Sequence, residues 1–492
     1  MTVRGNSLVE VGRPLQGVPD VMRRSTFLLV LCLAVASPVV AAAQAPHVAV
    51  DPRIELMTVV FRLAGSPEYR QCRFPAYARA IDDWFSPFRE HEAVQIAREL
   101  RQRYGIGYDA PMNLAIHLDA PPGLTPRVTL GEATLTLEDR WRRYGTAPFL
   151  AALRTFAVDT RFMAFMASQS ELHDATIARL SSFLESEVDF GWFSAFFGDR
   201  PSAEFYVVPG LCNGGANYGP RFRTAYGLEE LYGIVGVSAL DSTGMPRFDR
   251  GFITTVIHEF SHSYVNPLVD RQRERFAASA PRVFVTVSEE MRSLAYGAWP
   301  VTLAESVVRA AVVRYVEAKF GPEAAKREIT AQQGLGFIWM DELAQLLAGY
   351  ERDRRKYPKF ESFLPKLVAY YESLATRMDE VVAAYEATQP QVLSFSPSNE
   401  AVDIDPATTE IAIRFDRPMT GGYSIDYGPG GRATYPEVQG LAFDPAHTLL
   451  TLRVHLEPDH EYELILTGAA FRSQEGVPLG RHVLRFRTSP AR

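Results

Sequence analysis

Five consecutive residues carry the clearest chemical signal in this sequence. They are His258, Glu259, Phe260, Ser261 and His262, which form the pattern H-E-x-x-H. Residues four apart lie one turn apart on the same face of an α-helix, so both imidazoles can contact one ion. Two histidines placed in this way suit Zn²⁺, and the glutamate between them can take a proton from water. We therefore predict His258 and His262 as zinc ligands and Glu259 as a general base.

The surrounding residues predict the helix that this motif requires. Residues 252–265 are largely apolar, with polar side chains confined to part of the helix circumference. Asp249 is a suitable N-cap, and Asn266 with Pro267 is expected to end the helix. The structural alternative is a histidine pair on a buried helix with a salt-bridged glutamate. Because a chance H-E-x-x-H in a chain with 10 histidines occurs in only about one case in a hundred, we favour the metal site.

A zinc site of this kind needs a third protein ligand and leaves one position for water. The first histidine after His262 is His447, which we place in a different domain. A carboxylate between them is therefore the expected ligand, and the candidates are Glu289, Glu290 and Glu305.

We favour Glu305, which lies where a long amphipathic helix is expected to begin. The choice stays open, because Thr302 and Glu305 have the spacing of a capping box, in which the glutamate would serve the helix end and no metal. Arg309, four residues on, can pair with Glu305 as an ordinary salt bridge or hold it as a metal ligand.

The H-E-x-x-H motif is typical of zinc peptidases. Peptide hydrolysis needs a hydrogen-bond donor for the negative charge that develops on the carbonyl oxygen, and the candidates are Tyr218, Tyr264 and Tyr296. Strands are predicted at 204–208 and 231–239, with a Gly/Asn-rich loop between them. This segment is either a site of strand addition for a peptide or an ordinary turn region.

Residues 258–267 resemble the signature of DUF4932, a bacterial family of uncharacterised domains. Further similar segments are 48–57, 217–219 and 299–310, and the resemblance spans roughly 47–385. It implies a gluzincin-like metallopeptidase with His258 and His262 as ligands, Glu259 as base and Glu305 as third ligand. The sequence departs from the thermolysin pattern N-E-x-x-S-D, because Ser-Val-Val-Arg follows Glu305.

The composition is that of a globular, multidomain protein. The chain has 492 residues, of which 47% are hydrophobic and 22% charged, and its net charge is −7. No basic run with interleaved aromatic residues is present, which argues against nucleic-acid binding. Helices are expected at 53–63, 77–84, 90–104, 147–168, 307–320, 322–332, 339–350 and 360–387. The expected fold class is α+β: a mainly helical, zincin-like domain over 44–388 with a small sheet, followed by a β-sandwich.

Residues 1–43 read as a signal peptide, with Met22 as a possible true start, basic residues at 23–24, an apolar run at 27–36 and small residues at 41–43. The apolar run is too short to span a membrane. We expect an exported protein, periplasmic or secreted, with no stable membrane span. Export permits a disulfide between Cys72 and Cys212, but their separation favours two buried thiols.

The composition changes at residue 389, where short alternating runs punctuated by Pro, Gly, Asn and Asp begin. About seven strands in roughly 100 residues indicate a β-sandwich. Residues 396–419 and 456–466 resemble bacterial Ig-like domains of the SbsA type. The resemblance implies a spacer or adhesion module over 389–492 that contacts the cell envelope or another protein.

These observations favour an exported zinc metallopeptidase that acts on protein or peptide substrates. Two alternatives stay open: a catalytically inactive, peptidase-like binding module of the envelope, and a zinc hydrolase of cell-wall peptides or amides.

Overall fold

The computed structural model describes residues 45–131 and 136–491, and this part of the chain combines α-helices with three four-stranded β-sheets. Up to Glu386 it is mainly helical with one sheet, and from Val392 onward it is mainly β-strand. The signal peptide predicted over 1–43 lies outside the described residues. Among the helices within them, none is both long and apolar enough to cross a membrane.

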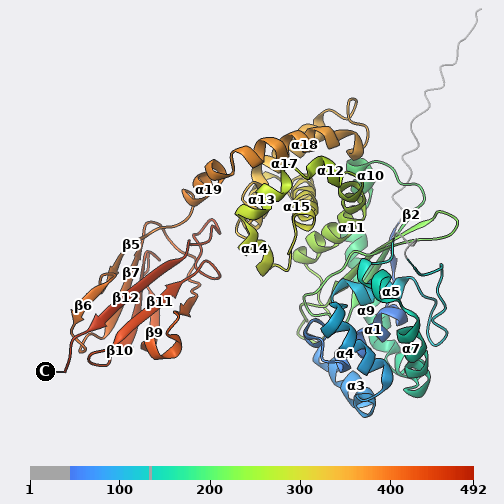
Figure 1. The fold of residues 1–492 in the computed structure, drawn as a ribbon, viewed down its shortest axis with the longest axis horizontal. Coiled ribbons are helices and arrows are strands. Elements are labelled where there is room, and N and C mark those ends of the chain that lie inside the picture. Colours follow the sequence, from blue (N-terminus) through green and yellow to red (C-terminus); the bar gives the residue numbers. More distant parts are fainter. Residues whose placement is uncertain (1–44, 132–135, 492) are drawn as a thin grey trace, which may run out of the picture. The chain divides into compact units, whose positions relative to one another are not determined.

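The N-terminal helices bury their apolar faces in a common core (Figure 1, blue to teal). They are α1 (Pro52–Leu63), α2 (Pro67–Arg70), α3 (Pro75–Phe85), α4 (Glu92–Tyr104), α5 (Asp109–Ile116), α6 (Asp139–Tyr144), α7 (Ala147–Asp159) and α8 (Phe162–Ser168). The next helix, α9 (Ser170–Glu187), buries Leu180 and Leu184 in a second core instead. The first three helix predictions are confirmed. The helix predicted over 147–168 is two helices, because Arg161 between them has a left-handed backbone with φ +53°.

The first sheet lies between two hydrophobic cores. Its strands are β1 (His47–Val48), β2 (Ala203–Gly210), β3 (Arg221–Arg223) and β4 (Glu229–Gly236), in the order β1-β2-β4-β3. The central strands are parallel, and β3 runs antiparallel to β4. Since side chains alternate between the faces of a strand, Ile234 enters the N-terminal core and Leu231 enters the opposite one. Both predicted strands are thus internal, and the edge strand near the loop is β3, which is not among the predicted strands.

The opposite core is built by the later helices (Figure 1, green to orange). They are α10 (Gly191–Phe197), α11 (Arg250–Arg271), α12 (Arg273–Phe276), α13 (Ala280–Thr286), α14 (Ser288–Ser293), α15 (Trp299–Phe320), α16 (Pro322–Gln333), α17 (Met340–Arg352), α18 (Phe360–Thr376) and α19 (Met378–Glu386). Helix α11 packs against both β4 and α15. The helix predicted over 360–387 is interrupted at Arg377, which is not helical.

Helix α11 begins where the sequence predicts but does not end there. Asp249 is its N-cap and accepts a hydrogen bond from the backbone N–H of Gly251. The helix continues through Pro267 to Arg271, so the predicted end at 266–267 is wrong. Proline cannot donate to the carbonyl four residues earlier, which belongs to Ser263. Arg200 donates to that carbonyl instead, with Nη1 at 3.0 Å, and so supplies the missing partner.

The C-terminal strands form two sheets that share one core. One sheet has the order β5-β7-β10-β9 and the other β6-β12-β11-β8. The strands are β5 (Val392–Ser396), β6 (Ala401–Ile404), β7 (Glu410–Phe415), β8 (Ile425–Tyr427), β9 (Glu437–Phe443), β10 (Leu449–His455), β11 (Glu461–Leu466) and β12 (His482–Thr488). Ile411 and Leu452 of the first sheet and Leu464 and Phe486 of the second belong to the same buried cluster. The change from helices to strands near residue 389 agrees with the prediction.

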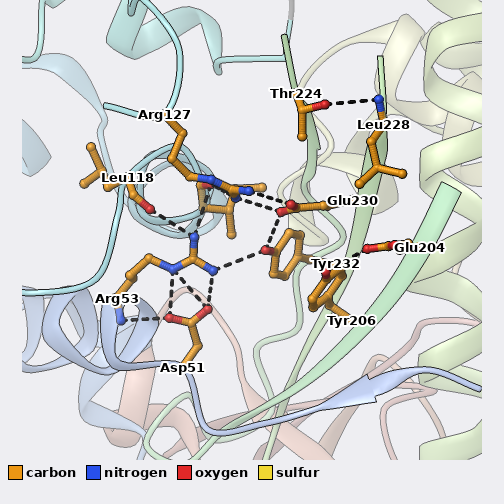
Figure 2. A network of polar contacts seen from close by, with 11 residues as sticks. Asp51, Arg53, Leu118, Arg127, Glu204, Tyr206, Thr224, Leu228, Glu230 and Tyr232 are labelled. Carbon is orange, nitrogen blue, oxygen red and sulfur yellow. Dashed lines mark hydrogen bonds and ion pairs between the residues drawn. The ribbon is translucent and has the colours of Figure 1, made fainter. Parts of the chain in front are cut away.

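A buried polar network ties α1 to the first sheet (Figure 2). Asp51 holds the Arg53 guanidinium, whose Nη2 lies 3.2 Å from the Tyr232 hydroxyl. That hydroxyl donates to Glu230 at 2.8 Å, and Glu230 also receives Arg127 Nη1 at 2.7 Å. Each charged group in this network is paired with a group of opposite charge. We therefore assign the network a role in the stability of the fold and not in catalysis.

One titratable group in the N-terminal core makes stability depend on pH. Glu55 of α1 is fully buried and accepts a hydrogen bond from the Tyr77 hydroxyl at 2.7 Å. Burial raises the pKa of Glu55 from 4.5 to about 7. Between these two values the folded protein keeps a proton that the unfolded chain releases. Ionisation of Glu55 therefore makes the folded state less stable as pH rises through this window.

We expect Glu55→Gln to remove this dependence. At about 1.4 kcal/mol for each pKa unit, the wild type should lose about 3 kcal/mol between pH 4.5 and pH 8 through this group, and the variant should not. Urea unfolding of both proteins at the two pH values measures the difference. If variant and wild type differ in free energy of unfolding by the same amount at both pH values, Glu55 is excluded as the source of the pH dependence.

Candidate metal centre

Helices α11 and α15 bring the predicted site residues together. His258 and His262 lie one turn apart on α11, and Glu305 lies on α15, which packs against it. The carboxylate of Glu305 is 3.6 Å from Nε2 of His258 and 3.3 Å from Nε2 of His262. The two Nε2 atoms are 3.1 Å apart. One ligand atom from each of the three residues lies within 4.8 Å of the other two, so a single cation can contact all three.

The structure separates the three candidates for the third ligand. Glu305 is buried beside both histidines, whereas Glu289 and Glu290 are exposed on α14 and do not belong to this cluster. The capping-box interpretation of Glu305 is wrong, because α15 starts at Trp299 and Glu305 lies inside it. Thr302 is also inside the helix, with its hydroxyl directed to the carbonyl of Ala298 at 3.4 Å.

Neighbouring side chains fix the orientation of the cluster. Arg309, one turn after Glu305, donates from Nε to the carboxylate at 3.1 Å. The same guanidinium donates to Gln332 at 2.6 Å and to the hydroxyl of Tyr296 at 2.8 Å. His262 Nδ1 lies 3.1 Å from Oδ1 of Asn266. Partners of this kind hold metal ligands in position.

Burial and mutual contact shift the pKa values of all four groups at this site. Burial lowers the pKa of His258 to about 3, which leaves its imidazole neutral. Burial also acts to lower the pKa of His262, but the adjacent Glu305 raises it to about 9. Although burial opposes it, both histidines hold the pKa of Glu305 below its usual range. Burial raises the pKa of Glu259 to about 7, which suits a group that takes up and returns a proton near neutral pH.

One residue of the cluster, His258, lines a cavity of about 330 Å³. His258, Glu259, Tyr296 and Arg309 line it. Of the three tyrosines considered as donors, only Tyr296 is among its lining residues. Tyr218 is buried with the N-terminal core, and Tyr264 stacks on Phe197. Tyr296 accepts a hydrogen bond from Arg309, and its hydroxyl also contacts the carboxylate of Glu305.

The loop before β3 also reaches the cavity. Asn217 lines it, and its amide is fixed by the N–H of Gly236 at 2.9 Å and by the carbonyl of Gly215 at 3.2 Å. A Cβ at Gly219 would lie 2.3 Å from the carbonyl oxygen of Glu259, so a side chain there would displace the loop from α11. The roles of Asn217, Gly219, Gln332 and Arg200 depend on long-range packing, which no local pattern in the sequence indicates.

The donor set fits Zn²⁺, which binds two imidazole nitrogens and a carboxylate oxygen in many proteins. The three residues are buried or half-buried, and Glu305 provides a negative charge. The same residues fall inside a known family, because residues 47–370 match the family described as "Domain of unknown function (DUF4932)". The chain belongs to the DUF4932 family.

The DUF4932 segment contains the whole cluster as well as α1 and the first sheet. A comparison with curated proteins found no match. One similar solved structure is CopC from Methylosinus trichosporium OB3b, with 17% identity and a TM-score of 0.18 over 21% of this chain and 97% of that chain. Another is the surface layer protein SbsC, domains 1–6, with 15% identity and a TM-score of 0.17 over 48% of this chain and 33% of that chain. Neither likeness carries an argument about function.

Proposed function

We propose that this DUF4932 chain is a zinc-dependent peptidase with a zincin-like catalytic domain. The convergence of His258, His262 and Glu305 on one point, with Glu259 in the same cavity, carries the proposal. Zn²⁺ held by these three residues would supply Lewis acidity and lower the pKa of a water molecule in its open position.

The protein groups have separable tasks in this reaction. Glu259 would take the proton of the attacking water on its carboxylate and pass it to the leaving amine. Tyr296 would donate its hydroxyl proton to the carbonyl oxygen as negative charge develops there. Arg309 would keep both Tyr296 and Glu305 in place through the hydrogen bonds described above.

Metal content tests the site directly. We expect about one zinc per wild-type chain and none in His262→Ala, because removing one of three protein ligands strongly weakens a zinc site. His455→Ala is the matched control, since His455 is exposed on β10 and should not affect metal content. Elemental analysis after dialysis gives the result. Metal-free wild type, even after incubation with Zn²⁺, would overturn the proposal.

We further propose that the protein is exported and that the C-terminal strands are an Ig-like module. Two four-stranded sheets around one core support the second part. The Cys72–Cys212 disulfide supports the first, because such bonds persist mainly in oxidising compartments. The module would act as a spacer or bind the cell envelope or another protein.

A further inference from the structure

A second cavity adjoins the metal centre along helix α11. Its volume is about 1040 Å³, and its walls include strand β3, the C-terminal half of α11 and the segments 197–200 and 359–361. Ser263, which lines it, directly follows the proposed ligand His262. The two cavities therefore meet the same helix at neighbouring positions.

This cavity is basic although the chain as a whole carries a net charge of −7. Its basic side chains include Arg200, Arg221, Arg223, Arg271, Arg273 and Lys359. Two of them have carboxylate partners: Arg200 pairs with Glu229, and Arg271 lies 3.5 Å from Glu361. Basic side chains outnumber acidic ones along the walls, so the local field favours an anionic ligand.

Arg221 stands out within this group because it is half-buried without a counter-charge. Among the described residues, its guanidinium forms no ion pair or hydrogen bond. Burial lowers the pKa of Arg221, and the more distant carboxylates Glu229 and Asp270 offset this effect only in part. A guanidinium taken out of water needs a hydrogen-bonded anion. A ligand carboxylate would match its planar, two-pronged donor geometry.

The position of Arg221 in the sheet directs it toward this cavity. Arg221 lies opposite Leu231, and paired residues share one face of a sheet, here the face that packs on α11. Phe222 points to the other face and is buried in the N-terminal core. Arg223, two residues on, shares the face of Arg221. Both arginines thus project from β3 toward the cavity, and both line it.

Residues 217–223, which include strand β3, contribute side chains to both cavities. In the first sheet, as the structure describes it, β3 is the last strand and pairs with β4 alone. An extended peptide that adds to this edge would direct alternate side chains toward Arg221. Asn217 lines the metal cavity, and Arg221 follows four residues later, which is roughly 13 Å of extended chain. One bound peptide can therefore reach both cavities.

We propose that Arg221 and the basic side chains around it bind a carboxylate of the peptide substrate, about four residues from the scissile bond. The inference rests on the proposed peptidase function, for which it names the substrate class. The carboxylate belongs either to an Asp or Glu side chain or to the C-terminus of the peptide. The first source makes the protein selective for acidic sequences, and the second limits it to cleavage near a free C-terminus.

Equilibrium binding tests this without turnover. The protein is the full chain with Glu259→Gln, and fluorescence anisotropy follows three sets of fluorescein-labelled ten-residue Ala/Gly peptides. One set carries a single Glu at successive positions and a C-terminal amide, the second carries Gln in place of Glu, and the third carries Gln with a free C-terminal carboxylate. We expect one carboxylate-bearing set to bind about 10- to 100-fold more tightly than the neutral set.

Arg221→Gln should abolish that preference and Arg223→Gln should reduce it. The charge-matched control is Arg103→Gln, whose side chain is exposed on α4, and it should retain the preference. Circular dichroism checks the fold of each variant, and exposed Arg223 provides a test even where Arg221→Gln does not fold. Equal affinity of the wild-type pocket for all three sets, or a preference that persists in a folded Arg221→Gln protein, would overturn the inference. Absence of hydrolysis alone would remove the peptidase proposal and leave a measured carboxylate preference standing.

Discussion

Glu259→Gln should lower kcat for peptide hydrolysis about 10²- to 10⁴-fold and leave one zinc per chain, because general-base catalysis contributes about this factor. Glutamine has the size of glutamate but cannot take up the proton of the attacking water. Glu259 lines the metal cavity without belonging to the cluster of three potential ligands, so its replacement removes the proton acceptor and not the metal.

The measurement pairs kinetics with metal analysis. A library of quenched fluorescent peptides gives kcat and KM, and elemental analysis of the same samples gives zinc content. Glu289→Gln is the matched control, because it makes the same chemical change at an exposed residue of α14 that does not belong to the cluster. We expect this control to keep both activity and metal.

Two other outcomes separate the alternatives. Full activity in Glu259→Gln would mean that another group takes the proton. A wild type that binds zinc and peptides but hydrolyses no peptide would instead support an inactive binding module, or a hydrolase whose substrate is another amide.

The site was predictable where its chemistry is local. His258 and His262 are four residues apart, about one helical turn, and this spacing can be seen directly in the sequence. The helix around them follows from its apolar residues and from the Asp249 cap. Spacing alone leaves Glu305 as one of three candidate ligands, because its role depends on where α15 begins. That helix starts at Trp299, with Pro300 in its first turn, and places Glu305 beyond any capping position.

The missed features all depend on contacts between distant segments. Pro267 is a strong local signal for a helix end, yet Arg200 offsets the lost hydrogen bond from a loop more than sixty residues earlier. Strand β3 is only three residues long, and its pairing with β4 alone identifies it. Arg221 and its cavity likewise have no local pattern, since the walls come from several separated segments.

The two cysteines are the clearest correction. Their separation in the sequence favoured buried thiols, but the structure joins Cys72 and Cys212 in a disulfide across 140 residues. The fold explains the pairing: Cys212 lies two residues after the end of β2, Cys72 lies between α2 and α3, and both cysteines contact the N-terminal core. The contact between the two cysteines cannot be inferred from the residues that flank each of them in the sequence.

This bond should be one of the largest single contributions to stability. A cross-link that closes a loop of 140 residues removes unfolded-chain entropy worth about 5 kcal/mol in the chain-entropy account. Cys212→Ala should therefore lower the free energy of unfolding by up to that amount. Urea unfolding of the wild type and Cys212→Ala, each with and without reductant, measures the loss.

Reductant provides the internal control for this experiment. It should destabilise the wild type to about the level of Cys212→Ala and leave that variant unchanged, because the variant has no bridge to lose. A wild type that resists complete reduction without loss of stability would contradict the prediction.

The same bond should matter to the metal centre through the loop that follows it. Cys212 begins the segment that carries Asn217 into the cavity and Gly219 against the backbone of Glu259. Release of one end of this loop should raise KM more than it lowers kcat, because the zinc cluster lies on α11 and α15 and keeps its geometry. Kinetics of Cys212→Ala at a temperature where it is fully folded test this. A loss of zinc content in Cys212→Ala would instead show that the disulfide stabilises α11 and α15 themselves.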